Sequence, residues 1–386
     1  MTSRPLRVGL VGCGNVALFD HLPFYASRPD LYQVVAVADP TGARRELARH
    51  AAGLDPEHAH ADAGELLARS DVDVVDVCTP QNARSAVVLA ALARGCDVIC
   101  EKPLATSPAA AQEMVTAAAA ATGQLAIMHN YLFLAEIAEA RRLVRSGEIG
   151  DVEVVIANYL GVRDMPGNAA FAPGWRHDPA AAGGGVLVDM LHAVYVAEAL
   201  LGSAIERVSG WVTARGSDAP VEDIAACRFE SGSRVALVNV GWGHGPGGIQ
   251  VSGSEGRIEV RYAGGGTGPF DEFESLLLTR GDGPAETIDV AAGDDGAAGI
   301  LIDFAEAIEE GRPAIATAEH GLRILEATLA VYASAHLGVT IPLPLDRSGA
   351  VFARGVAGLA DVPGCDWSPL RKRGLFTPRV SRAGVQ

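Results

Sequence analysis

Residues 6–17 of this chain read Leu-Arg-Val-Gly-Leu-Val-Gly-Cys-Gly-Asn-Val-Ala, and this stretch decides the fold. Its first half is the apolar run of a buried strand, and its second half opens a helix-like segment. Glycine lets the backbone turn tightly and approach a pyrophosphate, and the amides at the start of a helix donate hydrogen bonds to it. We therefore expect Gly12, Cys13, Gly14, Asn15 and Val16 to bind the phosphates of a dinucleotide.

A single glycine turn is a weak signal, but the strand that follows strengthens it. Residues 34–38 form a second apolar run, which ends at Asp39, 22 residues beyond Ala17. A carboxylate there accepts hydrogen bonds from the ribose hydroxyls of NAD and repels the extra phosphate of NADP. The sequence thus predicts NAD as the cofactor, with NADP disfavoured. Arg44 lies close enough to Asp39 that the use of both NAD and NADP stays open. Asp39-Pro40 can also be explained as a helix-entry turn.

The first third of the chain alternates short apolar runs with helical stretches, as in β-α-β units around a parallel sheet. This pattern predicts a doubly wound Rossmann sheet, and Pro23 is expected to kink or interrupt its first helix. The expected strands cover residues 7–12, 33–38, 73–78, 97–100 and 125–128, and the expected helices cover residues 15–28, 41–51, 62–69, 83–94 and 107–122.

Strands dominate the second part of the chain, which predicts an α+β domain with an open, predominantly antiparallel sheet. The expected strands cover residues 152–162, 205–215, 222–230, 234–241, 248–253, 257–262, 275–280, 285–290 and 339–343, and the expected helices cover residues 134–146, 186–201, 298–310 and 318–337. We expect a dinucleotide-binding domain over 1–128, a substrate and subunit-contact domain over 129–345, and a C-terminal extension over 346–386. The extension is either an ordered arm or a loose tail.

Length and composition favour two ordinary globular domains. The chain has 386 residues, a formal net charge of −16 and 49% hydrophobic residues. The acidic charge disfavours nucleic acid and anionic lipid as partners, and no apolar run reaches the ~18 residues of a membrane span. Without an apolar signal segment, the protein is expected in the cytoplasm, with its six scattered cysteines reduced. No metal site is expected, because His58-Ala59-His60 lacks an accompanying ligand cluster.

Two further segments follow predicted strands: Thr79-Pro80-Gln81-Asn82 and Glu101-Lys102-Pro103. The carboxyl ends of parallel strands border the ligand crevice, so both segments are expected to face the cofactor. The motifs of the second part are Trp175-Arg176, Gly183-Gly184-Gly185, Asp189-Met190-Leu191-His192, Gly311-Arg312-Pro313, Glu319-His320-Gly321-Leu322-Arg323 and Tyr332-Ala333-Ser334-Ala335. With the glycine turn and the carboxylate after the second strand, the chain resembles the Gfo/Idh/MocA oxidoreductase family over residues 6–345.

The resemblance implies an NAD-dependent enzyme that acts on sugars, cyclitols or their derivatives. It also implies a Rossmann domain followed by an open mixed sheet, whose exposed face commonly joins dimers or tetramers. In this sequence the cofactor contacts would include Thr79, Pro80, Asn82, Glu101, Lys102 and Asn130. The family's catalytic lysine maps onto Lys102, its Asp and His map onto Asp189 and His192, and the bond before Pro103 is often cis in relatives.

Two positions depart from the family pattern. Many members carry His five residues after the Thr of the Thr-Pro pair, whereas this chain has Arg84. This departure puts the local packing around the cofactor ribose or nicotinamide in doubt. Many members also separate the Asp and the His by three residues, whereas only Met190 and Leu191 intervene here, which makes the His assignment weaker than that of the Lys.

Oxidation of a secondary alcohol needs a base within hydrogen-bond reach of the hydroxyl. We expect His192 to be the proximal acid/base, Lys102 to anchor the reacting oxygen and share the proton, and Asp189 to hold a neighbouring hydroxyl and orient the imidazole. Asp189 and His192 are three residues apart in an apparently helical segment, so their side chains should share one face. The alternatives are a surface Glu101-Lys102 pair, a buried structural histidine and an aspartate that only caps a helix.

Further polar residues are expected to shape the substrate pocket. Tyr131 follows a strand, and Arg163, Trp175 and Arg176 lie near the long connection before the glycine triplet. Polar and aromatic side chains suit a carbohydrate, because hydroxyls need partners and an aromatic face covers the ring. Subunit contact is the alternative role of these residues.

The sequence therefore predicts a dehydrogenase for a ring hydroxyl of a sugar, cyclitol or glycoside, or a reductase for the matching ketone. Redox-neutral glycoside cleavage through transient oxidation stays open. So does a non-catalytic regulator that senses NAD or a sugar, because a fold does not fix a function. A homodimer or homotetramer is expected, because an exposed sheet face calls for a partner subunit.

Overall fold

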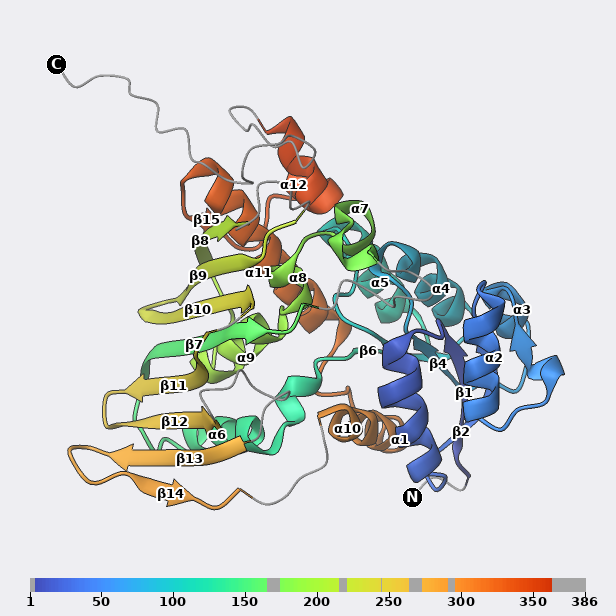
Figure 1. Ribbon diagram of the computed structural model, residues 1–386, viewed down its shortest axis with the longest axis horizontal. Helices are drawn as coiled ribbons and strands as arrows, with labels where there is room; N and C mark the ends of the chain where they lie inside the picture. The colour runs from blue at the N-terminus through green and yellow to red at the C-terminus, as the bar shows by residue number, and fades with distance from the viewer. Residues whose placement is uncertain are drawn as a thin grey trace.

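The computed structural model describes residues 4–164, 174–214, 221–243, 245–263, 273–290 and 296–362, which form two sheets side by side (Figure 1). Sheet A has the strand order β3-β2-β1-β4-β5-β6, and all of its pairings are parallel. Its strands are β1 (Leu6–Val11), β2 (Tyr32–Ala38), β3 (Ala59–His60), β4 (Val74–Val77), β5 (Asp97–Cys100) and β6 (Leu125–Ile127). The predicted Rossmann sheet is confirmed, while the short β3 was missed.

Helices cover both faces of sheet A. On one face α4 (Gln81–Ala93) and α5 (Pro108–Ala120) bury Val88 and Met114 against β4 and β5. On the other face α1 (Leu22–Ser27) packs together with α10 (Gly296–Glu310). Two shorter helices, α2 (Gly42–Ala51) and α3 (Ala63–Leu67), complete the expected set.

Pro23 was expected to kink or interrupt the first helix, and the helical segment changes its type directly before this proline. A π-helical turn, η1 (Ala17–His21), runs directly into α1, and Pro23 stands in its first turn. Proline is tolerated in the first turn of a helix because the N–H that it lacks has no partner there. The wider π turn therefore accommodates the proline, and it also delivers His21 into the protein interior.

Sheet B is open and predominantly antiparallel, as predicted, with the strand order β14-β13-β12-β11-β7-β10-β9-β8-β15. One pairing is parallel, that of β7 (Val152–Val162) with β10 (Arg234–Trp242). The remaining strands are β8 (Arg207–Thr213), β9 (Ile224–Ser231), β11 (Gly247–Gly253), β12 (Gly256–Tyr262), β13 (Phe273–Arg280), β14 (Glu286–Ile288) and β15 (Ile341–Pro342).

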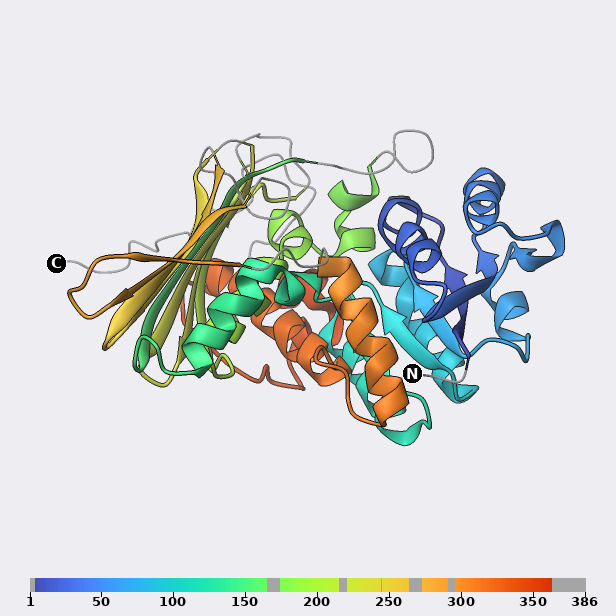
Figure 2. The ribbon, with the colours of Figure 1, turned by 90° about the horizontal axis from the view of Figure 1, so that it is seen from below.

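Helices cover only one face of sheet B (Figure 2). These are α6 (Ala135–Arg145), α9 (His192–Leu201) and α11 (Ala318–Leu337), whose buried residues join the core beneath the sheet. On the opposite face Trp211 and Leu237 are exposed, at 46% and 40%.

Two late helices connect the sheets. Tyr32 of β2 donates a hydrogen bond from its hydroxyl to the carbonyl of Leu301 in α10, at 2.7 Å. Next to α11, Thr317 forms an isolated bridge with Ala126 of β6. Elements from beyond residue 128 thus pack on the first sheet. The predicted domain boundary at this residue stays a prediction.

The described part of the C-terminal extension is an ordered arm. It contains α12 (Ala350–Arg354) and the 3-10 helix η6 (Gly355–Asp361), whose Phe352, Val356 and Leu359 are buried in the main core. Residues 363–386 lie outside the described residues.

Within the described ranges no single helix is long and apolar enough to cross a membrane. A bent pair of segments, Pro179–Asp189 with His192–Leu201, meets that length and composition only when taken together.

Candidate active site

The glycine turn after β1 has the backbone that the sequence suggested. Gly12 has a φ of +94°, and a Cβ there would lie 2.7 Å from the Cys78 carbonyl carbon and 2.8 Å from the Thr79 nitrogen. Only glycine fits such a left-handed, closely approached position. At Gly14 a Cβ would meet no described atom within 4 Å, so this side of the turn is open to a ligand.

Asp39 braces this turn. Its Oδ2 accepts a hydrogen bond from the backbone N–H of Cys13 at 2.9 Å, and its Oδ1 accepts one from Thr41 at 2.7 Å. A carboxylate has about four acceptor sites, so Asp39 retains the capacity to accept ribose hydroxyls. Burial raises the pKa of Cys13 to about 12, and the charge of Asp39 acts in the same direction, whereas Arg45 and Arg44 oppose it. The thiol of Cys13 is therefore neutral.

Arg84, the first departure from the family pattern, fastens the two loops that border the crevice. It is buried, donates from Nε to the carbonyl of Thr79 at 3.0 Å, and donates from Nη1 to the carbonyl of Pro103. The loop after β4 is thereby tied to the loop after β5. The buried Oγ1 of Thr79 lacks a hydrogen-bond partner among the described residues, as expected of an atom that serves a ligand. The chain thus fits a dinucleotide at this edge.

Glu101 and Lys102 follow β5 at the same edge of sheet A. The Oε2 of Glu101 accepts the Lys102 backbone N–H at 3.0 Å, and the bond between Lys102 and Pro103 is cis, as the resemblance implied. Burial acts to raise the pKa of Glu101, but the nearby His21 imidazole and the charge of Lys102 outweigh it and lower that pKa. Glu101 is therefore a carboxylate beside the lysine.

Behind Glu101 lies a buried polar cluster that the sequence did not reveal. His21 Nδ1 is 2.7 Å from Asp76 Oδ2, which also accepts the Tyr25 hydroxyl at 2.8 Å, and His21 Nε2 is 3.4 Å from Glu101 Oε1. Burial acts to lower the pKa of His21, but Asp76 raises it well above its ordinary value. Since Nε2 lacks hydrogen-bond geometry toward Glu101, we treat this last contact as an ion pair only.

The same cluster brings together ligand types that can bind a metal. His21, Asp76 and Cys78 offer ligand atoms within 4.8 Å of one another, the one such group found in the described ranges. In the His58-Ala59-His60 segment, His58 Nδ1 lies 2.7 Å from Arg69, and His60 lies 3.7 Å from Glu65.

Lys102 reaches across to the second sheet. Its Nζ donates a hydrogen bond to the backbone carbonyl of Asp189 at 2.7 Å. Burial lowers the pKa of Lys102, and the charges of Asp189 and Glu101 only partly oppose this effect. A lysine of this kind loses its proton more easily than one on the surface.

The expected continuous helix over residues 186–201 is wrong, and Lys102 explains the break. The chain forms α8 (Val186–Asp189) and then α9, bent by 45°. In an unbroken helix the carbonyl of Asp189 would accept the N–H of Ala193. Here Lys102 takes that carbonyl, and Ala193 donates to Met190 instead. Asp189 and His192 thus lie in separate helices, and of the two it is Asp189 that Lys102 contacts.

The carboxylate of Asp189 is held by side chains of the substrate region. Arg176 Nε lies 3.4 Å from Oδ1, and the indole Nε1 of Trp242 donates to Oδ2 at 3.4 Å. The guanidinium of Arg176 also lies over the ring of Trp175, 4.9 Å from its centroid. The structure therefore brings Asp189, Arg176 and Trp175 together, and it adds Trp242, which no sequence motif indicated.

We expected Asp189 to orient the imidazole of His192, but a tyrosine holds it instead. Its Nδ1 lies 2.6 Å from the hydroxyl of Tyr195, and its ring stacks on Tyr131 with centroids 3.9 Å apart. Burial lowers the pKa of His192 well below its ordinary value, and the charge of Lys102 adds to this effect. Tyr195 follows His192 at the i+3 position of α9, a spacing that could have revealed the pair.

Asn130 and Tyr131 stand on η3 (Asn130–Phe133), directly after β6. Asn130 Oδ1 accepts the Tyr195 hydroxyl at 3.4 Å. The buried hydroxyl of Tyr131 lacks a hydrogen-bond partner within the part of the chain that the structure describes. These residues therefore join the end of sheet A to the histidine of α9.

A second histidine pair lies beside this group. The ring of His129 stacks on Tyr195 at 4.2 Å, and its Nδ1 is 3.2 Å from His320 Nδ1. His320 Nε2 lies 3.5 Å from Glu198, which also binds Arg323 at 3.0 Å. His320 thus contacts His129, which in turn stacks on Tyr195. The sequence did not assign this supporting role to the motif around His320.

The glycine triplet before α8 is required by close packing. A Cβ on Gly185 would lie 2.2 Å from the carbonyl oxygen of Glu222, and one on Gly184 would lie 2.4 Å from the Tyr332 hydroxyl. Glu222 accepts the N–H groups of Gly185 and Leu187 and the hydroxyl of Tyr332. Burial raises the pKa of Glu222 to about 7, although these hydrogen bonds oppose it. The triplet therefore fixes where α8 begins.

Arg163 lies at the edge of this region. It lines a pocket of about 300 Å³ with Val162, Asp164, Asp223, Trp242 and Gly243. Beside it, His177 Nε2 is 2.9 Å from Asp164, and the His177 ring lies 5.1 Å from that of Trp242. Trp242 connects this pocket to Asp189. Among the remaining cofactor candidates, Pro80, Asn82 and Asn15 are exposed and Val16 is half-buried.

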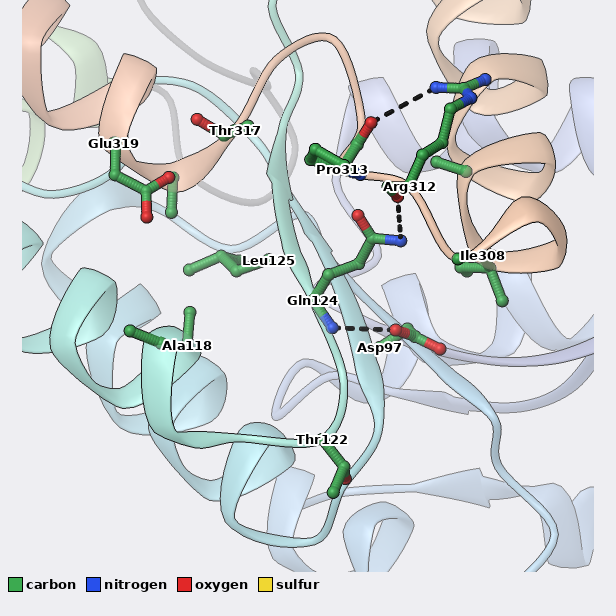
Figure 3. A pocket seen from close by; sticks show the side chains of 14 residues that line it. Asp97, Ala118, Thr122, Gln124, Leu125, Ile308, Arg312, Pro313, Thr317 and Glu319 are labelled. Carbon is green, nitrogen blue, oxygen red and sulfur yellow. Dashed lines mark hydrogen bonds between the residues drawn. The ribbon is translucent and has the colours of Figure 1, made fainter.

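A larger cavity of about 450 Å³ lies away from these residues (Figure 3). Its lining includes Asp97 and Leu125, the first residues of β5 and β6, and Gln124, which donates to Asp97 at 2.9 Å. Ligands of open α/β sheets bind at the carboxyl ends of the strands. The cavity is at the opposite ends, so we do not assign the chemistry to it.

Two consecutive segments of the chain match known sequence families. Residues 6–129 match an oxidoreductase family with an NAD-binding Rossmann fold, and residues 137–259 match the GFO/IDH/MocA C-terminal domain. The D-glucoside 3-dehydrogenase of Escherichia coli is 33% identical over 52% of this chain, although the match spans only 56% of that enzyme. A dTDP-3,4-didehydro-2,6-dideoxy-alpha-D-glucose 3-reductase of Streptomyces violaceoruber is 33% identical over 80% of this chain and 86% of the relative.

Among solved structures, aldose-aldose oxidoreductase from Caulobacter crescentus superposes with a TM-score of 0.78. It is 25% identical, and the alignment covers 88% of this chain and 100% of that one. These matches agree with the two sheets, with the glycine turn after β1 and with the position of Lys102 after β5. The chain therefore belongs to the Gfo/Idh/MocA family of oxidoreductases, and its first sheet is an NAD-binding Rossmann fold.

Proposed function

We propose that this protein is an NAD-dependent dehydrogenase for a ring hydroxyl of a sugar, cyclitol or glycoside, and that it also catalyses the reverse reduction. The observation that carries the proposal is the contact between Lys102 Nζ and the carbonyl of Asp189. It fixes a lysine of lowered pKa at the carboxyl ends of the sheet A strands, next to the segment that begins with His192.

The reaction converts a secondary alcohol and NAD⁺ into a ketone, NADH and a proton. NAD⁺ held at the glycine turn and Asp39 would supply the hydride acceptor, while side chains of the protein handle the hydroxyl proton. Lys102 anchors the reacting oxygen and shares its proton, and His192 accepts that proton at its imidazole. Asp189 holds a neighbouring hydroxyl, aided by Arg176 and Trp242, which fix its carboxylate.

The substrate class follows from the lining of the site and from the relatives. Carboxylate, guanidinium and indole groups meet at Asp189, and these groups suit a ring that carries several hydroxyls. The names of the relatives refer to a glucoside and to a deoxyhexose nucleotide. We infer that Tyr131, Arg163 and Trp175 also border the substrate.

Turnover by the full chain tests the proposal. The purified protein is mixed with NAD or NADP and a panel of methyl glucosides, levoglucosan, free aldoses and inositols, and the absorbance of the reduced cofactor is followed. We expect NADH to form with at least one member of the panel. Release of the aglycone without NADH would instead indicate redox-neutral cleavage, and NAD binding without any turnover would indicate a regulator.

The charge of Asp39 is expected to set the cofactor preference. In Asp39→Asn the side chain keeps its shape but loses the charge that favours ribose hydroxyls over a phosphate. A hydrogen bond to a charged group contributes ~1.5–3 kcal/mol, so KM for NAD should rise about 10- to 100-fold while KM for NADP falls.

Initial rates at varied NAD and NADP measure this change. Glu57→Gln removes the same charge at an exposed position and serves as the control, for which both KM values should stay unchanged. An unaltered ratio of the two KM values in Asp39→Asn would remove Asp39 from the cofactor site.

We further propose that the open face of sheet B contacts a second subunit. Trp211 and Leu237 are exposed in β8 and β10 and alternate with the buried Val212 and Val238, so they point away from the core beneath the sheet. Large apolar side chains exposed together on a sheet favour burial by a partner. This arrangement gives a homodimer, or a homotetramer if two dimers associate.

A further inference from the structure

The hydroxyl of Tyr195 is the centre of a buried hydrogen-bond group. It lies 2.6 Å from His192 Nδ1, accepts the backbone N–H of Tyr131 at 3.1 Å, and lies 3.4 Å from Asn130 Oδ1. The Tyr195 side chain is fully buried, and His129 stacks on its ring. The hydroxyl therefore has three protein partners and is shielded from water.

The number of protons selects one arrangement of this group. A tyrosine hydroxyl has one proton to donate and two lone pairs to accept with. The Tyr131 N–H can only donate, and the Asn130 carbonyl oxygen can only accept. If the Tyr195 proton goes to Asn130, the second lone pair accepts a proton from His192 Nδ1, and all the partners are satisfied. If the proton goes to His192 instead, Asn130 loses its donor.

The favoured arrangement leaves the other nitrogen of His192 as a base. With the proton on Nδ1, the Nε2 atom carries a lone pair that can accept the hydroxyl proton of a substrate. After that transfer the imidazolium still donates from Nδ1 to Tyr195, so one of its two N–H groups stays satisfied. This matters because the ring is buried and lies near Lys102, which disfavours the charged form.

We propose that Tyr195 is a positioning residue that holds His192 in the tautomer protonated at Nδ1, with Nε2 as the proton acceptor. The proposal rests on the dehydrogenase function proposed above. It replaces the role first expected of Asp189, whose carboxylate is engaged by Arg176 and Trp242.

The test is Tyr195→Phe, which removes the hydroxyl and keeps the ring that stacks on His129. We expect kcat for alcohol oxidation to fall about 10- to 100-fold, because the imidazolium loses a hydrogen bond made to a charged group. The KM for NAD should stay within about twofold. The pH at which the rate reaches its plateau should shift, which a purely structural defect would not cause.

A matched control removes another buried hydroxyl. Tyr32→Phe deletes the hydrogen bond to Leu301, and Tyr32 is as buried as Tyr195 but lies on the first sheet. Its kcat should stay at the wild-type value. A Tyr195→Phe enzyme with the kcat and pH profile of the Tyr32→Phe enzyme would overturn the proposal.

A spectroscopic measurement separates this proposal from the function on which it rests. The chain has ten histidines, and in protein labelled with ¹⁵N-histidine the His192 signals are those lost in His192→Gln. The ¹⁵N shifts should show the Nδ1–H tautomer in the wild type and its loss in Tyr195→Phe. An Nε2–H tautomer in the wild type would overturn the proposal even if the enzyme turns over, whereas silence on the substrate panel would overturn only the proposed function.

Discussion

Replacing Lys102 by methionine is expected to reduce kcat for alcohol oxidation by about 10³-fold, within the range in which acid–base groups contribute to catalysis. The Nζ of Lys102 joins the end of β5 to Asp189, and its lowered pKa suits the sharing of a proton. Methionine has a similar length and apolar stem but offers no N–H and no charge. Single-turnover measurement of NADH formation separates this loss from any change in product release.

A second substitution separates charge from proton transfer. Lys102→Arg keeps the positive charge, but a guanidinium does not release its proton in proteins. We expect Lys102→Arg to lose a similar factor in kcat. NAD affinity, followed by quenching of tryptophan fluorescence, should remain within severalfold in both variants. Near-normal turnover in the arginine enzyme would mean that Lys102 acts only as a fixed charge, and near-normal turnover in both would remove it from the mechanism.

The sequence predicted the first sheet well because its signals are local. The apolar run of β1 ends at a glycine turn, and that of β2 ends at a carboxylate. The type of each element and the place where it ends can therefore be predicted from the segment itself. The two-residue β3 was missed because it is too short to show a period. Long strands such as β7 were equally readable, since turn residues bound them.

The parts that the sequence did not predict depend on contacts between distant residues. Met190 and Leu191 are good helix formers, so nothing local marks the break between α8 and α9. The break comes from Lys102, which lies 87 residues away and takes the carbonyl of Asp189. Likewise α10 looked like a helix of the second domain, but it packs on β2 of the first sheet.

The candidate site shows the same division. Lys102, Asp189 and His192 were predicted because the motifs around them resemble a family, and the structure brings Lys102 into contact with Asp189. The role of Tyr195 depends on side-chain geometry that no motif states. The same is true of Trp242, which comes from the end of β10 and meets Asp189 across 53 positions.

Removal of the Asp76 carboxylate is expected to cause the largest loss of stability. Asp76 is fully buried between the His21 imidazole and the Tyr25 hydroxyl, at 2.7 and 2.8 Å. Breaking a buried ion pair by neutralising one partner costs about 3–5 kcal/mol, because the other charge is left without compensation. The midpoint of urea unfolding should therefore fall markedly in Asp76→Asn. Asp30→Asn, which disrupts an exposed pair with Arg28, should leave it nearly unchanged.

The pH dependence of this loss identifies its cause. The folded protein raises the pKa of His21 well above its ordinary value, through Asp76. A group whose pKa is raised on folding stabilises the fold fully below its unfolded pKa, about 6.5 for histidine, and this stabilisation is lost as pH rises through the folded value. The gap between the wild-type and Asp76→Asn urea midpoints should thus be widest at pH 6 and should narrow toward pH 9. A gap between the two midpoints that is constant with pH would mean that Asp76 binds a neutral imidazole. In that case His21 would carry no positive charge next to Glu101.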